Sequence, residues 1–162
     1  MSEEQQAAPP VDAAERVRGI VERVIDALGV DGTVDVIETD RQITAVVDGE
    51  DVGRLIGRRG QTIDAVQLIC YRAAQRGAKE RKRVIVDAAG YRERRREQVI
   101  GQAERAAARA LETGREIELE PMSATERKIV HDHLKGRPGI ETFSEGDEPD
   151  RCVIVAPLVT DE

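Results

Sequence analysis

The sequence predicts an α+β protein made of two small domains. Segments with apolar residues at helical spacing alternate with short segments rich in β-branched residues. The length of 162 residues suits one ordinary domain or two of about 70 residues each. Aromatic residues make up only 2% of the chain, so any core must be aliphatic. No apolar run approaches the ~20 residues of a membrane-spanning helix, and residues 1–10 lack the pattern of a signal peptide. We therefore expect a soluble, cytoplasmic protein.

The first domain is expected over residues 12–90, after a disordered tail at 1–11. Helical spacing of apolar residues, β-branched runs and glycine stops define its elements. The order is helix, strand, strand, short helix, helix and strand, over residues 12–28, 33–38, 42–47, 51–56, 61–76 and 83–87. The inner face of the helix at 61–76 is expected to consist of Ile63, Val66, Ile69, Cys70 and Ala73.

A long helix over about residues 91–114, basic at its start, is expected to link this domain to a second one at 115–162. The second domain begins with a strand at 116–121. Ser123 and Glu126 then form a capping box, in which each side chain bonds the other residue's backbone, and this opens a helix that ends near Leu134. Two strands at 141–144 and 151–155 are expected to close the domain as a hairpin.

The basic residues of the chain are concentrated in its middle. Residues 53–96 carry 13 basic and 4 acidic groups, whereas the whole chain has a net charge of −7. A basic block between acidic flanks indicates a site for a polyanion. The alternative interpretation is that these arginines and lysines only solvate helix faces and pair with the acidic flanks.

The most informative segment of this block is Leu55-Ile56-Gly57-Arg58-Arg59-Gly60-Gln61-Thr62-Ile63. Two glycines three residues apart break the helices and allow a sugar–phosphate chain to approach the backbone closely. Two arginines at the tip can reach phosphate, and the helix that begins at Gln61 points N–H groups at anions. The expected apolar wall for bases consists of Ile56, Ile63 and Val66.

This glycine segment, within its order of elements, resembles a KH domain of type II over residues 12–87. The resemblance implies a module that clamps about four nucleotides of single-stranded RNA against the segment Gly57–Gly60.

The helix that follows begins Tyr91-Arg92-Glu93-Arg94-Arg95-Arg96. Cations in a first helical turn oppose the helix dipole, so their position favours a functional role. Two roles stay open: contact with phosphate, expected of Arg92, Arg95 and Arg96, or pairing with the acidic flanks.

Arg127 and His131 lie four residues apart on the capped helix and so share a face. With their surroundings they are similar to the signature of the R-three-H domain, named for an Arg-x-x-x-His motif. That family binds single-stranded nucleic acid, which implies that Arg127 and His131 contact a phosphate or a base.

A KH domain followed by an R-three-H domain resembles the bacterial Jag proteins, also called SpoIIIJ-associated or KhpB proteins, over residues 12–160. The resemblance implies an RNA-binding regulator linked to cell elongation, division or envelope growth. It also implies a partnership with a small single-domain KH protein. Many relatives carry an additional N-terminal domain, and the resemblance over residues 12–160 implies nothing about the role of that domain.

No catalytic or cofactor site is expected. His131, Asp132 and His133 point in different directions on one helix, which leaves too few ligands for a metal. Cys70 and Cys152 are expected to be small buried hydrophobes, and no phosphate-binding P-loop occurs. Two other functions stay open: a protein-interaction adaptor that uses the KH domain for dimerisation or docking, and a binder of single-stranded DNA.

Overall fold

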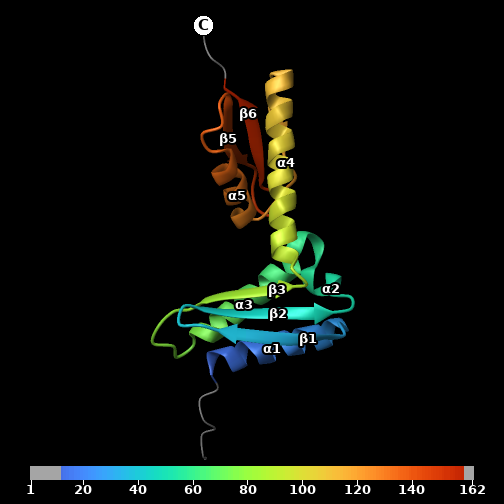
Figure 1. The fold of residues 1–162 in the computed structure, drawn as a ribbon, viewed down its shortest axis with the longest axis vertical. Helices are drawn as coiled ribbons and strands as arrows, with labels where there is room; N and C mark the ends of the chain where they lie inside the picture. Colours follow the sequence, from blue (N-terminus) through green and yellow to red (C-terminus); the bar gives the residue numbers. More distant parts are fainter. Residues whose placement is uncertain (1–11, 159–162) are drawn as a thin grey trace, which may run out of the picture. The chain divides into compact units, whose positions relative to one another are not determined.

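The computed structural model describes residues 12–158, which form two compact units with a boundary after Tyr91 (Figure 1). The predicted N-terminal tail lies outside the described residues. Each unit combines helices with a three-stranded sheet, which confirms the α+β fold class.

The first unit contains all the elements expected from the sequence, in the expected order. They are α1 (Ala13–Leu28), β1 (Gly32–Glu38), β2 (Gln42–Gly49), α2 (Gly53–Ile56), the 3-10 turn η1 (Arg58–Gly60), α3 (Gln61–Gln75) and β3 (Arg83–Ala88). Helix α1 is capped at its start by Asp12, whose side chain accepts a hydrogen bond from the Ala13 N–H, and at its end by Gly29 in the left-handed conformation.

The sheet of the first unit has the strand order β1-β2-β3, with β1 antiparallel and β3 parallel to the central strand β2. Alternate residues of β2, namely Ile43, Ala45 and Val47, are buried against the helices, as the period of a strand requires. Helices α1 and α3 pack against each other and against the sheet (Figure 1). The core is aliphatic, as the composition requires.

The second unit is built on α4 (Tyr91–Thr113), whose first residue precedes the boundary. It continues through β4 (Ile117–Glu118), α5 (Ala124–Leu134), β5 (Ile140–Glu145) and β6 (Cys152–Pro157). Its sheet is antiparallel, with the order β4-β6-β5. The capping box predicted at the start of α5 is present, with Ser123 and Glu126 bonding each other's backbone N–H groups.

Helix α4 supplies much of the core of this second unit. Its buried residues are Val99, Ala103, Ala106, Ala107 and Ala110. They pack with Val130 of α5 and with Val153 and Val155 of β6. Because alanine has a short side chain, the helix backbone can lie close to its neighbours. The segment that the sequence suggested as a connection is thus also a structural element of the second unit.

Two expectations about α3 are wrong. The inner face was expected to include Ile69, which is 54% exposed, and Ala73, which is only half-buried, whereas Ala74 is buried. The buried residues are Ile63, Val66, Cys70 and Ala74, whose spacing of three or four follows one face of a helix. Ile69 lies six residues after Ile63, which is well away from that face at about 100° per residue.

Candidate nucleic-acid interface

The backbone of the glycine segment, residues 57–60, turns sharply between α2 and α3. Gly57 has φ 72° and Gly60 has φ 77°. Arg59, between them, also has a positive φ of 53°, a conformation that L side chains adopt with strain. Strain of this kind is concentrated at functional sites, where the surrounding structure imposes it.

The side chains of Thr62 and Tyr91 leave no room for a Cβ atom on Gly57 and Gly60, respectively. A Cβ atom on Gly57 would lie 2.7 Å from the Cβ of Thr62, and one on Gly60 would lie 2.9 Å from Cε1 of Tyr91. Such contacts are far closer than carbon atoms tolerate. The absence of side chains at these two positions therefore lets the loop pack tightly against Thr62 and Tyr91.

The loop presents positive charge and the N–H donors of a helix start at the same place. Arg58 is exposed and Arg59 is half-buried. Helix α3 begins directly after Gly60, and no side chain caps its N-terminus. The first N–H groups of a helix have no partner within the helix, and the helix dipole attracts negative charge to them. An anion at this turn would meet Arg58 and the start of α3, where Gln61 is exposed.

The predicted apolar wall is only partly at the surface. Ile56 is half-buried, but Ile63 is 0% and Val66 4% exposed, so these two support the loop from within the core. Sequence reasoning missed the apolar side chains that are exposed on α3, Leu68 at 56% and Ile69 at 54%. Their helical positions relative to Ile63 and Val66 were the signal that could have identified them.

The arginines at the start of α4 differ in their surroundings. Arg95 donates from Nε to Glu126 at 2.6 Å, and both side chains are largely buried. Arg96 is exposed, and Arg92 is half-buried. The sequence left two roles open for these arginines, contact with phosphate or pairing with acidic residues. Arg95 pairs with an acidic residue, whereas Arg96 is exposed to solvent. Glu126 also completes the capping box, so it connects α4 to the start of α5.

Arg127 is almost fully buried, with 8% of its surface exposed. Its guanidinium donates to the Met122 carbonyl at 2.7 Å and to the Glu148 carboxylate at 2.6 Å. Glu148 lies in the acidic connection between β5 and β6, and its own side chain is 59% exposed. The buried arginine of the Arg-x-x-x-His motif thus fixes the connection between β5 and β6 through its bond to Glu148.

His131 shares the face of Arg127 but contacts β5. Its Nδ1 lies 2.7 Å from the Thr142 hydroxyl and its Nε2 lies 3.0 Å from the Ser144 hydroxyl. Hydroxyl groups can donate or accept, so both contacts suit either neutral tautomer of the imidazole. Burial, followed by the charge of Arg127, lowers the pKa of His131. A neutral imidazole is therefore favoured at neutral pH.

The other chemical groups considered in the sequence lie in ordinary structural surroundings. Burial raises the pKa of the Cys70 thiol to about 11, which makes it a poor nucleophile. His133 bonds to Glu104 at 2.6 Å, and Arg137 bonds to the same carboxylate. Within residues 12–158, no group of three or more His, Cys, Asp or Glu side chains is arranged to hold a metal ion. None of the helices in that range is long and apolar enough to cross a membrane.

Comparison with known families agrees with this architecture. The family model for the KH domain of KhpA and KhpB matches residues 14–87, and the model for the R-three-H domain matches residues 97–157. The fold and the glycine loop therefore define a protein of the class that joins a KH domain to an R-three-H domain.

Several relatives carry the name RNA-binding protein KhpB. The relative from Clostridium symbiosum is 37% identical over 84% of this chain and 62% of its own length. The one from Bacillus subtilis is 32% identical over 90% of this chain and 71% of its own length. The one from Streptococcus pneumoniae is 34% identical over 88% of this chain, which spans 43% of that relative. The chain belongs to the KhpB family, the Jag-type proteins that its motifs resemble.

Proposed function

We propose that this chain binds single-stranded RNA and that the glycine loop, residues 57–60, holds the RNA backbone. The observation that carries the proposal is the exposed Arg58 beside the uncapped N-terminus of α3, on a loop that its two glycines allow to turn tightly. The names of the relatives, RNA-binding protein KhpB, support the same ligand.

In the proposed mode of binding, a phosphate accepts hydrogen bonds from the first N–H groups of α3 and pairs with Arg58 or Arg59. Gln61 and the exposed part of Ile56 lie next to the loop and contact the neighbouring sugar or base. Ile63 and Val66 contribute by keeping α3 packed on the core. Arg92 and Arg96 are proposed to add phosphate contacts.

The role proposed for Arg127 and His131 is more indirect than the sequence suggested. Arg127 already pairs with a carboxylate, so a phosphate can reach it only by replacing Glu148. His131 can meet RNA only if one of its two hydroxyl partners on β5 is exchanged. We propose that both residues mainly position the surface of the second unit. Arg127 contacts RNA directly only where a phosphate replaces the Glu148 carboxylate.

We further propose that the protein acts by binding and not by catalysis, in the cytoplasm, as a post-transcriptional regulator. A link to cell elongation, division or envelope growth and a partnership with a small single-domain KH protein belong to the same proposal. They rest on the resemblance to the Jag proteins.

The loop is tested by fluorescence anisotropy with short single-stranded RNA and matching DNA over a salt series. We expect the affinity of the wild type to fall with a log–log slope of about −0.7 for each phosphate contacted. Arg58→Asp with Arg59→Asp should reduce binding at least tenfold, because a repelling charge replaces each cation at the loop. Circular dichroism checks that the variant is folded. Unchanged affinity of the folded variant would contradict the assignment of the loop, and equal affinity for DNA would show that the site does not read the 2′-hydroxyl.

A second candidate function, that of a protein-interaction adaptor, is favoured by the exposed pair Leu68 and Ile69 on α3. A partner that covers these two neighbouring side chains would remove their apolar surface from water, which favours association. Binding of a protein there should depend little on salt, in contrast to RNA binding. A Leu68→Ser/Ile69→Ser variant that binds RNA normally but loses a protein partner would support the adaptor function.

A further inference from the structure

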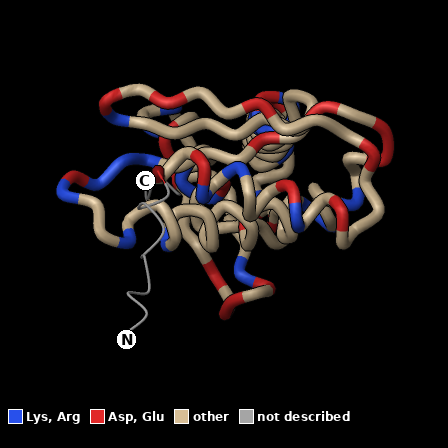
Figure 2. The backbone as a smooth tube through the Cα atoms, turned by 90° about the horizontal axis from the view of Figure 1, so that it is seen from below, with Lys and Arg blue, Asp and Glu red and all other residues tan. Residues whose placement is uncertain are grey.

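A second basic surface lies on the first unit, at the end of the sheet where β3 begins. The connection between α3 and β3 together with the first residue of β3, residues 76–83, has the sequence Arg-Gly-Ala-Lys-Glu-Arg-Lys-Arg, with five basic residues and one acidic residue. Arg41, in the turn between β1 and β2, is adjacent, because its carbonyl accepts the Arg83 N–H at 2.9 Å. Figure 2 shows this connection as a mostly blue run. We call residues 76–83 with Arg41 the distal basic surface.

The stability of the helix does not explain this surface. A cation at the end of a helix interacts favourably with the helix dipole, which explains Arg72 in the last turn of α3 and Arg76 at its C-cap. Lys79, Arg81 and Arg83 follow after the helix has ended, and the dipole acts only within its last turn.

Pairing with acidic residues does not explain it either. Lys82 forms an ion pair with Glu38 at 2.7 Å. Lys79, Arg81 and Arg83 are exposed and form no ion pair with any residue in the described range 12–158. These three positive charges therefore face solvent together, although the chain as a whole is acidic.

The backbone that carries these charges is held at both ends. The side chain of Gln75 donates to the Lys82 carbonyl at 2.8 Å, and Arg16 of α1 donates to the Arg76 carbonyl, also at 2.8 Å. The Arg83 N–H bond to Arg41 fixes the start of β3. A surface fixed in this way loses less conformational entropy when it binds a ligand.

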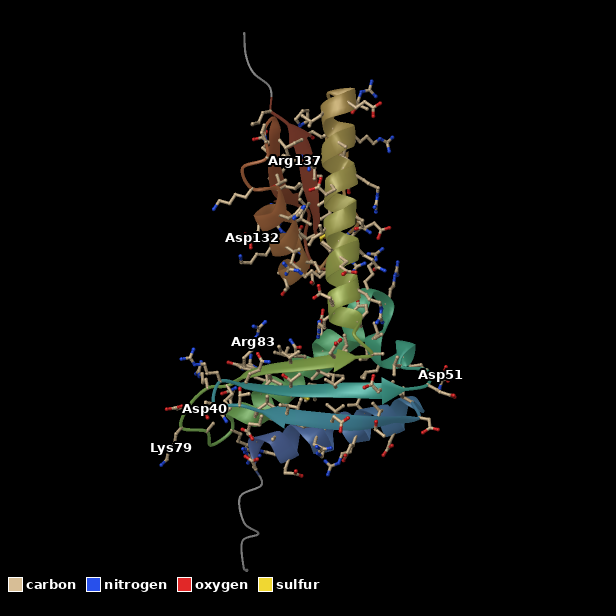
Figure 3. The ribbon with its side chains drawn as sticks, in the orientation of Figure 1. Asp40, Asp51, Lys79, Arg83, Asp132 and Arg137 are labelled. Atoms are coloured by element: carbon tan, nitrogen blue, oxygen red, sulfur yellow. The ribbon has the colours of Figure 1, made fainter. Side chains whose placement is uncertain are left out.

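The distal basic surface and the glycine loop lie at opposite ends of β3. The strand starts at Arg83 and ends at Ala88, three residues before Tyr91, whose ring lies against Gly60. At about 3.3 Å per residue, its six residues span roughly 17 Å or more. Figure 3 shows Lys79 and Arg83 at one end of the sheet and Asp51, which precedes α2, at the other. The two basic sites are therefore separate.

We propose that the distal basic surface binds phosphates of the same RNA strand that occupies the glycine loop. The inference rests on the proposed function and extends it. A KH loop holds about four nucleotides, so the phosphates at Lys79, Arg81 and Arg83 belong to nucleotides beyond that segment. The contact is electrostatic and independent of sequence, and it lengthens the footprint of the first unit.

The test compares two lengths of RNA on the full chain, about five and about sixteen nucleotides of uniform sequence, chosen to fall near and well above the four held by a KH loop. The variant is Lys79→Glu with Arg81→Glu and Arg83→Glu. We expect its affinity for the longer RNA to fall at least tenfold and its affinity for the shorter RNA to change less than twofold. The salt slope with the longer RNA should decrease in magnitude by about 2, or 0.7 for each of three contacts.

A matched control reverses three exposed arginines of the second unit, Arg105, Arg109 and Arg115, to glutamate and so changes the net charge equally. A glutamine version of the distal variant removes the charges without adding repulsion, and circular dichroism checks folding. The proposal is overturned if the folded distal variants bind the longer RNA like the wild type, or if the control loses as much affinity. Failure of the proposed function would look different, since the wild type would then bind neither RNA.

Discussion

At the residue scale, the glycine loop depends on the absence of a side chain at Gly57 and at Gly60. Gly57 and Gly60 have backbone conformations that favour glycine, and each also faces a side chain that would collide with a Cβ atom. The two requirements are independent, since relief of the contact with Thr62 would still leave Gly57 at φ 72°. Between them the loop carries Arg59 in a left-handed conformation that is strained for a residue with a Cβ atom.

His131 gives a prediction about pH at the same scale. Its pKa is below the ordinary value of 6.5 because of burial and the nearby Arg127. The unfolded chain therefore takes up the proton first as the pH falls, so the contribution of His131 to stability is present above 6.5 and is lost as the pH falls to the lower folded pKa. We expect the melting temperature of a His131→Gln variant to fall less than that of the wild type between about pH 7.5 and 5.5.

The measurement is thermal unfolding followed by circular dichroism at several pH values. The titration of the carboxylates is common to both proteins and cancels in the difference. A His133→Gln variant serves as the matched control, because His133 lies on the same helix. An equal loss of stability in the wild type and in His131→Gln would contradict the prediction.

At the scale of elements, side-chain ion pairs join α4 to α5 and to the residues just after it, although β4 lies between the two helices in the chain. At the start of α5, Glu126 accepts the Ser123 N–H of the capping box and also pairs with Arg95 of α4. Glu104 of α4 pairs with His133 and Arg137, at the other end of α5. Helix α5 is thus attached to α4 by charged groups at both ends, while Val130 between them packs into the core.

Arg127 should stabilise the connection between β5 and β6. Its replacement by methionine keeps most of the buried volume but removes the bonds to Met122 and Glu148. We expect a loss of about 1–3 kcal/mol in the free energy of unfolding, with faster hydrogen exchange in residues 146–151. Glu148→Gln, which keeps an acceptor on an exposed side chain, should cost no more than about 1 kcal/mol.

Chemical denaturation and hydrogen exchange measured on the same three proteins test this role. If Arg127→Met lowers RNA affinity without changing stability or exchange, Arg127 acts through direct contact with RNA and the positioning role is wrong.

Much of the fold follows from local sequence signals, and the exceptions involve contacts between distant segments. The helices, the strands and the capping box depend on residues within a few positions, so their patterns predicted them. The burial of Arg127 depends on Glu148, 21 positions away in the chain. The motif indicated which face Arg127 shares with His131, but only the folded sheet shows that an acidic connection covers it.

At the scale of the whole molecule, charge and apolar residues are distributed differently. The basic groups are concentrated in the middle of the chain, whereas each unit has its own aliphatic core. The first core includes Ile43, and the second includes Leu134, both almost fully buried. Every buried residue of each core belongs to its own unit.

These separate cores predict that stability is lost locally. Ile43→Ala and Leu134→Ala should each cost about 2–5 kcal/mol, since each leaves a cavity. We expect amides in the unit that carries the substitution to exchange at least about 30-fold faster, the factor that corresponds to 2 kcal/mol. Amides in the other unit should change little. Hydrogen exchange with mass spectrometry on the full chain measures both units at once, and an equal effect in both would show that the units unfold together.

The position of Tyr91 has a practical consequence. The chain has two tyrosines, one phenylalanine and no tryptophan, so tyrosine dominates its intrinsic ultraviolet emission. One of the two, Tyr91, lies with its ring against Gly60, and the other, Tyr71, lies on α3. Replacing Tyr71 with phenylalanine would leave a single tyrosine, at the glycine loop. The protein thus carries its own optical probe at the place where a ligand is expected, and occupancy of the loop can be followed without attaching a dye.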